Sequence, residues 1–270
     1  MAAKDKSISK LFEQYIESVP TAQNAVDAIP GWTCALPPEA SATAGTLPLY
    51  ADNRVAWLID RYGALDGRTV LELGPLEGSH TYMLERAGAA RIDAVEANRL
   101  AYLRCLVFKE LVQLQRARFH LGNFVAWLNL PDLRYDLIVA SGVLYHLQDP
   151  LHLLERAAAA TDALFLWTHY MSEEAMPEGD PRRGVFRKSI ERRSFHGVDV
   201  RLYPRSYHRA EENASFCGGL YDDHRWLHRE DLLAVLGALG FASIEIDHDQ
   251  VDHPNGPSFS VLARRSANLA

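Results

Sequence analysis

Short apolar runs alternate with longer stretches of helical periodicity between residues 67 and 170. Each run is mostly β-branched or aliphatic and is bounded by turn-forming or polar residues. This alternation predicts right-handed βαβ units, in which buried parallel strands are joined by crossover helices. The predicted strands are Thr69 to Leu73, Arg91 to Glu96, Ala117 to Leu121, Tyr135 to Ser141 and Ala163 to Thr168.

The pattern closes differently near the C-terminal end. A helix is predicted from Arg229 to Leu239, stopped by Gly240. Two strands follow, Phe241 to Ile246 and Ser258 to Ala263, on either side of a turn at residues 254–256. A closing hairpin makes the last strand antiparallel, whereas a purely parallel nucleotide-binding sheet more often ends with another βα unit. We therefore predict an α/β fold with a mostly parallel, Rossmann-like sheet.

Two segments depart from the βα rhythm. Residues 1–66 predict a helical N-terminal cap broken by proline and glycine, and residues 171–226 predict a lid inserted after the fifth strand. The cofactor-binding core would then span residues 67–170, with its C-terminal part at 227–270. The lid segment carries a basic cluster made of Arg182, Arg183, Arg187, Lys188, Arg192 and Arg193, which is typical of a solvated face.

Composition narrows the class of protein. The 270 residues carry a formal net charge of -7, which disfavours a surface built to neutralise a phosphate backbone and makes a nucleic-acid partner unlikely. Cys34, Cys105 and Cys217 are odd in number and widely spaced, as expected of thiols in a reducing compartment. Neither a signal peptide nor an apolar run long enough to cross a membrane is evident, so we expect a cytoplasmic protein.

The turns after the first two strands suggest a nucleoside site. Gly74 and Gly78 let the backbone turn sharply off the strand that contains Glu72, and they admit a ligand near a helix start at His80. Glu96 ends the second strand 22 residues past Gly74, the offset at which a carboxylate reaches ribose hydroxyls. A plain structural turn, and a Glu96 that only caps the next helix, are the alternatives.

The turns after the third and fourth strands add candidate contacts. Gly122, Asn123 and Phe124 follow the third strand, where an amide and an aromatic ring suit an adenine. The fourth strand runs into the most specific segment of the chain, Tyr135 to Pro150, which contains Ser141, Gly142 and Tyr145.

From about Asp66 to Ala263 the chain resembles the class I S-adenosylmethionine-dependent methyltransferases. The Glu72 to Gly78 turn resembles their first motif, Glu96 their acidic second motif, residues 122–124 the third and residues 135–150 the fourth. The sequence GVLYHLQDP is similar to that of the tRNA wobble-uridine carboxymethyltransferases and of small-molecule methyltransferases with the same core.

This resemblance implies a seven-stranded sheet with an antiparallel last strand. S-adenosylmethionine would be the cofactor and S-adenosylhomocysteine the product. The implied contacts are Glu72, Gly74, Gly78, His80, Glu96, Ala97, Gly122, Asn123, Phe124, Ser141, Gly142 and Tyr145. The chain departs from the family at Leu76, where a glycine is usual, and at the flanking Pro75 and Glu77.

Methyl transfer needs alignment of the acceptor, exclusion of water and, for a hydroxyl or protonated amine, a base. His146 and His169 follow the fourth and fifth strands at the edge where such sheets bind ligands, and Tyr145 precedes the first of them. These three are the candidate catalytic residues. A capping or cofactor role for His146, and a structural hydrogen bond for His169, are the alternatives.

Aromatic residues near the lid are candidates for the acceptor pocket, although they equally suit a small core of the lid itself. We predict substrate contacts from Trp167, Tyr170, Tyr207, Tyr221 and His224, with Tyr203, Phe216 and Trp226 nearby. His224 and His228 lie four apart, but no further ligands complete a tetrahedron, so no metal site is predicted.

The leading hypothesis is a small-molecule O- or N-methyltransferase of specialised metabolism. A tRNA-modifying methyl or carboxymethyl transferase is the second, and a non-catalytic cofactor-binding subunit the third. The sequence leaves the oligomeric state open, with a homodimer as one option.

Overall fold

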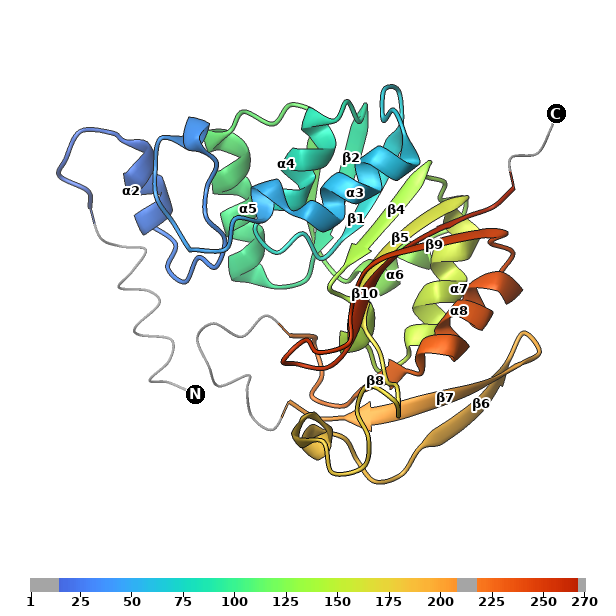
Figure 1. Ribbon diagram of the computed structural model, residues 1–270. Helices are drawn as coiled ribbons and strands as arrows, with labels where there is room; N and C mark the ends of the chain where they lie inside the picture. The colour runs from blue at the N-terminus through green and yellow to red at the C-terminus, as the bar shows by residue number, and fades with distance from the viewer. Residues whose placement is uncertain (1–14, 208–217, 267–270) are drawn as a thin grey trace.

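The computed structural model describes residues 15–207 and 218–266, and its centre is a twisted sheet with helices on both faces (Figure 1). The seven strands lie in the order β3-β2-β1-β4-β5-β10-β9. β10 runs antiparallel to both of its neighbours, and the pairs among β1 to β5 are parallel. The predicted Rossmann-like sheet with an antiparallel last strand is therefore confirmed. The strands are β1 (Thr69–Leu73), β2 (Arg91–Glu96), β3 (Ala117–Leu121), β4 (Leu137–Ser141), β5 (Ala163–His169), β9 (Ser243–Gln250) and β10 (Ser258–Arg264).

The predicted starts of two strands are wrong, and β5, β9 and β10 extend past their predicted ends. β4 begins at Leu137, because Tyr135 forms only an isolated bridge with Thr161. β9 begins at Ser243, because the backbone N–H of Phe241 donates to Leu236 O at 3.2 Å and its ring is buried in the turn after helix α8. The apolar character of Phe241 thus reflects burial of a turn and not strand pairing.

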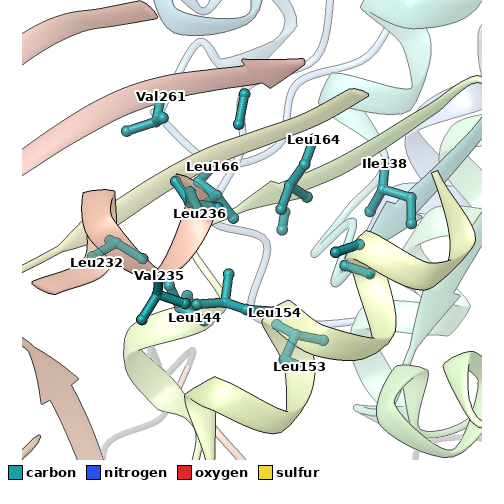
Figure 2. Packing of buried hydrophobic residues seen from close by; sticks show 14 of the residues in the cluster. Ile138, Leu144, Leu153, Leu154, Leu164, Leu166, Leu232, Val235, Leu236 and Val261 are labelled. Carbon is teal, nitrogen blue, oxygen red and sulfur yellow. The ribbon is translucent and has the colours of Figure 1, made fainter. Parts of the chain in front are cut away.

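Two of the crossover helices, at residues 99–111 and 150–160, begin at polar capping residues. Asn98 accepts hydrogen bonds from two N–H groups at the start of α5, and Asp149 caps α7 ahead of Pro150. Leucines of α7 and α8 pack against β4, β5 and β10 (Figure 2). The helices of the core are α3 (Asn53–Tyr62), α4 (Ser79–Arg86), α5 (Arg99–Leu111), α6 (Phe124–Leu128), α7 (Pro150–Ala160) and α8 (Arg229–Ala238). No helix in the described ranges is both long and apolar enough to span a bilayer.

The N-terminal segment is less helical than predicted. Between residues 15 and 52 it contains only α2 (Ala22–Asp27) and the 3-10 turns η1 (Pro38–Ala40) and η2 (Leu49–Ala51). Buried Glu77 fixes this segment to the core, because its carboxylate accepts from the N–H groups of Thr33 and Cys34 and pairs with Arg104 at 3.3 Å. Arg104 in turn donates to Pro30 O. Glu77, a departure from the family motif, therefore links the N-terminal segment to the first turn.

Replacing Glu77 with glutamine is expected to lower the free energy of unfolding by about 3 kcal/mol, since the buried Arg104 then loses its carboxylate. Urea unfolding followed by circular dichroism measures the change. Asp162→Asn is the control, because Asp162 and Arg134 form an exposed pair whose loss should cost less than about 0.5 kcal/mol. Equal losses of unfolding free energy in the two variants would contradict this role of Glu77.

The segment between β5 and α8 contains a second sheet that the sequence analysis did not predict. Strands β6 (Glu191–Phe195), β7 (Val198–Arg205) and β8 (His224–Leu227) pair antiparallel in that order, after the 3-10 turn η4 (Pro181–Val185). Val200, Leu202 and Leu227 belong to the same buried cluster as α7 and α8. Alternation of Val198, Val200 and Leu202 with polar residues was the available signal, which the surrounding basic residues obscured.

Candidate active site

The first motif loop joins β1 to α4 through three residues in left-handed backbone conformation. Gly74, Leu76 and Gly78 have φ of 64°, 57° and 89°. A Cβ on Gly74 would lie 2.8 Å from a methyl group of Val143, so glycine is needed there for space as well as for backbone freedom. Leu76 adopts the left-handed conformation at a cost of about 1 kcal/mol. The replacement of the usual glycine thus leaves the tight turn intact.

Glu96 ends β2 and faces that loop. Its carboxylate accepts from Leu76 N at 3.2 Å and from Asn98 N at 2.7 Å, and the residue is only 8% exposed. Burial raises the pKa of Glu96, while the two backbone N–H groups favour its ionised form. A carboxylate accepts up to about four hydrogen bonds, so two remain for hydroxyl donors.

Glu72 and His80 are directed to protein partners. Glu72 is buried on β1 and accepts a hydrogen bond from the Thr81 hydroxyl, and burial raises its pKa. His80 Nε2 lies 2.9 Å from Asp52, whose pKa is held below its usual range by His80 and Arg54 despite burial. His80 therefore couples α4 to the start of α3 instead of capping its own helix.

A pocket of about 540 Å³ opens beside the carboxyl end of β3. Gly122 and Asn123 line it, and Ala97 follows β2 next to it in the sheet. The Asn123 side chain caps α6 by accepting from Val125 N at 2.8 Å. Phe124, the first residue of α6, packs against the core and does not line the pocket. The remaining lining residues are Val95, Tyr102, Phe119, His120, Leu121, Ala126, Trp127 and Leu130.

An aromatic cluster follows β4 and β5. Gly142 follows Ser141, and its N–H donates to Trp167 O at 2.9 Å; a Cβ there would lie 3.5 Å from the Trp167 ring and 3.8 Å from the Tyr145 hydroxyl. Tyr145 lies on η3 (Leu144–His146) with its ring centroid 4.7 Å from that of His169 and 4.0 Å from that of His146. The predicted catalytic residues therefore meet at one place, directly beside a predicted cofactor contact.

A second pocket of about 240 Å³ opens onto this cluster. Its lining residues are Tyr145, His146, His169, Arg205, Gly218, Trp226 and Asn255. The Trp226 ring stacks on His169 at 4.9 Å between centroids, with an angle of 6° between their planes. Aromatic faces around a small cavity suit a methyl acceptor that must be held with water excluded.

The hydrogen bonds of His169 fix its tautomer. Its Nδ1 lies 2.8 Å from Gly256 O and 3.2 Å from Pro257 O; since both carbonyls only accept, Nδ1 carries the proton and Nε2 the lone pair. Burial, His253 and Arg205 lower the pKa of His169 to about 4, so the ring is neutral near pH 7.

His146 Nδ1 lies next to a hydroxyl group, whereas His169 Nδ1 lies next to carbonyl oxygens. Gly219 N donates to the Tyr207 hydroxyl at 2.9 Å, and that hydroxyl lies 2.5 Å from His146 Nδ1. When Tyr207 donates to Nδ1, the His146 proton is on Nε2; in the other tautomer Nδ1 carries the proton and donates to the hydroxyl. Burial and the neighbouring His224, His169 and Arg205 lower the pKa of His146 to about 3.

Three of the five predicted substrate contacts lie in the aromatic cluster, and two do not. Trp167 lies beneath the Arg54 guanidinium at 4.2 Å and edge-on to Tyr145, and Tyr207 stacks on His224. Tyr170 and Tyr221 lie elsewhere.

Tyr170 is buried in the main core, where it contacts Phe259 and its hydroxyl donates to Asp249 at 2.6 Å. This orientation follows from β5, whose successive side chains alternate between the two faces of the sheet. Tyr221 is 59% exposed and does not line the pocket. Phe216 and Cys217 lie outside the described residues, whereas Cys34 and Cys105 are buried.

His224 and His228 have separate partners. His224 Nδ1 lies 2.8 Å from Asp222 O, whereas His228 contacts Glu173 at 2.9 Å and Arg201 at 2.7 Å. Their spacing therefore reflects two structural hydrogen-bond sets.

The sequence analysis missed Arg205 and Asn255 in this pocket. Arg205 ends β7 and Asn255 lies in the turn before β10. Nothing in the local sequence distinguishes Arg205 from the many other arginines of the segment. Asn255 was noted only as part of a turn.

The sheet order, the glycine turn and the acidic end of β2 together define the fold of a class I methyltransferase. The chain belongs to the methyltransferase domain family, whose sequence model matches residues 49–244.

Solved structures of similar proteins share the fold. The N-terminal domain of EvdMO1, described with S-adenosylhomocysteine and D-fucose, superposes with a TM-score of 0.61 at 24% identity, covering 98% of this chain and 97% of that domain. A 1,6-didemethyltoxoflavin-N1-methyltransferase from Burkholderia thailandensis has a TM-score of 0.51 at 17% identity, covering 82% of this chain and 79% of that protein.

Among curated proteins, the chain is similar to a tRNA U34 carboxymethyltransferase from Idiomarina loihiensis, with 30% identity over 96 residues. That match covers 34% of this chain and 29% of the relative, so it spans less than a third of that enzyme's length.

Proposed function

We propose that this protein transfers a methyl group from S-adenosylmethionine to a hydroxyl or amine of a small molecule. The observation that carries the proposal is the position of Gly142: this predicted cofactor contact donates to Trp167 O and leaves little space before the hydroxyl of Tyr145, which lines the small aromatic pocket. Methyl transfer requires the cofactor site and the acceptor pocket to be adjacent in this way.

The residues present fit the cofactor. Glu96 has acceptor capacity left for two ribose hydroxyls, and the pocket beside Gly122 and Asn123 has the volume of a ligand site. Ser79 Oγ, at the start of α4, is buried with no hydrogen-bond partner among the described residues, as expected where a polar ligand group is missing. The sulfonium supplies an activated methyl group when bound.

The chain's own residues would position the acceptor, exclude water and receive its proton. His169 Nε2 is the candidate base because its Nδ1 proton is committed to backbone carbonyls. The aromatic faces of Tyr145 and Trp226 bound the cavity in which the acceptor would lie.

The ion pairs of the basic cluster favour a small methyl acceptor over tRNA. Arg182, Arg187, Arg192 and Arg193 are each paired with an aspartate of this chain. Their charges are thus largely neutralised and do not form an open cationic surface for phosphates. The two solved neighbours described with a sugar or a heterocycle support the same class of acceptor.

Isothermal titration of the purified protein is expected to give micromolar dissociation constants for S-adenosylmethionine and S-adenosylhomocysteine, corresponding to about −8 kcal/mol. Incubation with labelled donor and a panel of phenols, sugars and amines should then label at least one acceptor. Binding without transfer to any acceptor would favour a non-catalytic subunit. Tight tRNA binding that weakens steeply with salt would instead support the tRNA-modifying alternative.

A further inference from the structure

Arg205 is a cation in the wall of the acceptor pocket. Its guanidinium carbon lies 4.7 Å from the centroid of the Trp226 ring and 5.8 Å from that of Phe186. Among the described residues its hydrogen-bond partner is His224, whose Nε2 lies 3.5 Å from Arg205 Nη1. The Nε atom is buried and has no hydrogen-bond partner among the described residues. Burial lowers the pKa of Arg205.

No acidic side chain of the described residues lies within 4.0 Å of this guanidinium, although neighbouring arginines are well paired. Arg201 binds Asp231 and Arg225 binds Glu191, both from the same small sheet. The histidines that face Arg205 are neutral near pH 7, so they supply no negative charge. A buried cation without a counter-charge costs several kcal/mol unless something else compensates for it.

Trp226 Nε1 is a second buried donor without a hydrogen-bond partner among the described residues, on the ring that Arg205 covers. An indole N–H and a guanidinium N–H can only donate, so only an acceptor satisfies them. An anionic oxygen group would satisfy both hydrogen-bonding capacity and charge. A single cation matches the charge of a carboxylate better than that of a phosphate dianion, and the planar fork of arginine suits a carboxylate.

We propose that Arg205 binds a carboxylate of the methyl acceptor, so that the substrates of this pocket are small carboxylic acids. The inference rests on the proposed methyltransferase function, and it adds the substrate class. The carboxylate would orient the acceptor against Arg205 while the aromatic walls hold its apolar part.

Binding of benzoate and its neutral counterpart benzamide to protein saturated with S-adenosylhomocysteine tests the proposal. Wild-type protein should bind benzoate at least tenfold more tightly than benzamide, by calorimetry. Arg205→Met should reduce this ratio to about one, and Arg205→Lys should retain part of it because the charge remains. Arg187→Met is the matched control, since Arg187 belongs to the same segment but is half exposed and paired with Asp223, and it should keep the wild-type ratio.

Thermal unfolding distinguishes recognition from a structural role. Because Arg205 is half-buried and no acidic side chain of the described residues lies within 4.0 Å of it, Arg205→Met should unfold at or above the wild-type temperature, and benzoate should stabilise only proteins that contain Arg205 or its lysine substitute. A large drop in unfolding temperature for Arg205→Met would indicate a structural ion pair and overturn the proposal.

The remaining outcomes are also decisive. Equal binding of benzoate and benzamide by the wild type, a preference that survives in Arg205→Met, or absence of benzoate binding would refute carboxylate recognition. Tenfold tighter binding of phenyl phosphate than of benzoate would assign the pocket to phosphates instead. Failure of the wild type to bind S-adenosylhomocysteine would count against the proposed function itself, whereas normal cofactor binding without anion preference would count only against this inference.

Discussion

Glu96→Ala is expected to weaken S-adenosylmethionine binding about a hundredfold or more. Two hydrogen bonds from ribose hydroxyls to an ionised carboxylate contribute about 1.5–3 kcal/mol each, and alanine removes both. Calorimetric titration with S-adenosylhomocysteine measures the loss. Because Glu96 also accepts from Leu76 N and Asn98 N, the variant should lose some stability as well, so unfolding must be measured in parallel.

Glu85→Ala provides the matched control for this experiment. Glu85 likewise accepts from backbone N–H groups, those of Gln115, Arg116 and Ala117, but it lies at the end of α4, away from the glycine turn. It should therefore lose stability and keep its cofactor affinity. Similar affinities of the two variants would remove Glu96 from the cofactor site.

The pH dependence of cofactor binding offers an independent check on Glu96. Burial raises its pKa, so protonation should begin at a higher pH than for an ordinary glutamate. Affinity should accordingly fall on acidification, starting above that ordinary range. A flat affinity down to the onset of unfolding would argue that the Glu96 charge does not contribute.

His169→Asn is expected to lower kcat by about a hundred- to ten-thousandfold, the usual contribution of a general base. The asparagine amide can still donate to Gly256 O, as His169 Nδ1 does, so the hydrogen bond to the last turn is retained. What disappears is the Nε2 lone pair that faces the pocket. Affinity for S-adenosylhomocysteine should stay close to that of the wild type.

His146→Asn is the comparison, and it should reduce kcat less than His169→Asn. His146 Nδ1 is already hydrogen-bonded to the Tyr207 hydroxyl at 2.5 Å, so this nitrogen is engaged and His146 is less well placed than His169 to act as the base. If His146→Asn instead proves the more damaging change, the two roles are reversed. Full activity in both variants would exclude general-base catalysis by either histidine.

The pH profile of kcat/KM supplies a further test of His169. Its pKa is lowered to about 4, so the base remains neutral across the physiological range and activity should decline only as pH falls toward that value. An inflection near the ordinary histidine pKa of about 6.5 would point to a different, less buried group.

Much of the sheet was predictable because buried strands and helices leave recognisable patterns of apolar residues in the sequence. β1, β2 and β3 have the predicted bounds, since buried parallel strands show as short apolar runs between polar turns. The glycine turn and Glu96 were predictable for a related reason, as their spacing along the chain follows from one βαβ unit. These features depend on residues close in sequence.

Side-chain roles that depend on distant partners were not predictable. Tyr170 and His169 are adjacent in sequence, but successive side chains of an extended segment point to opposite faces. Tyr170 is therefore buried in the core, whereas His169 lines the pocket. His80 is a predicted cofactor contact, and the sequence did not indicate that its Nε2 would lie 2.9 Å from Asp52, the N-cap of another helix. Glu77, noted only as a departure from the motif, binds a segment more than 40 residues earlier.

By itself, then, the sequence determined the fold class, the parallel direction of the first five strands and the edge of the sheet at which a nucleoside site would form. Each of these follows from local periodicity and spacing. Only the tertiary structure decided that the His169 proton is on Nδ1 and that Arg205 lies in the same pocket without an acidic partner among the described residues. The His169 proton is held by Gly256, 87 residues away, and Arg205 reaches the pocket from a sheet that local propensity did not reveal. Protonation and charge pairing are set by neighbours in space, which the order of residues along the chain does not specify.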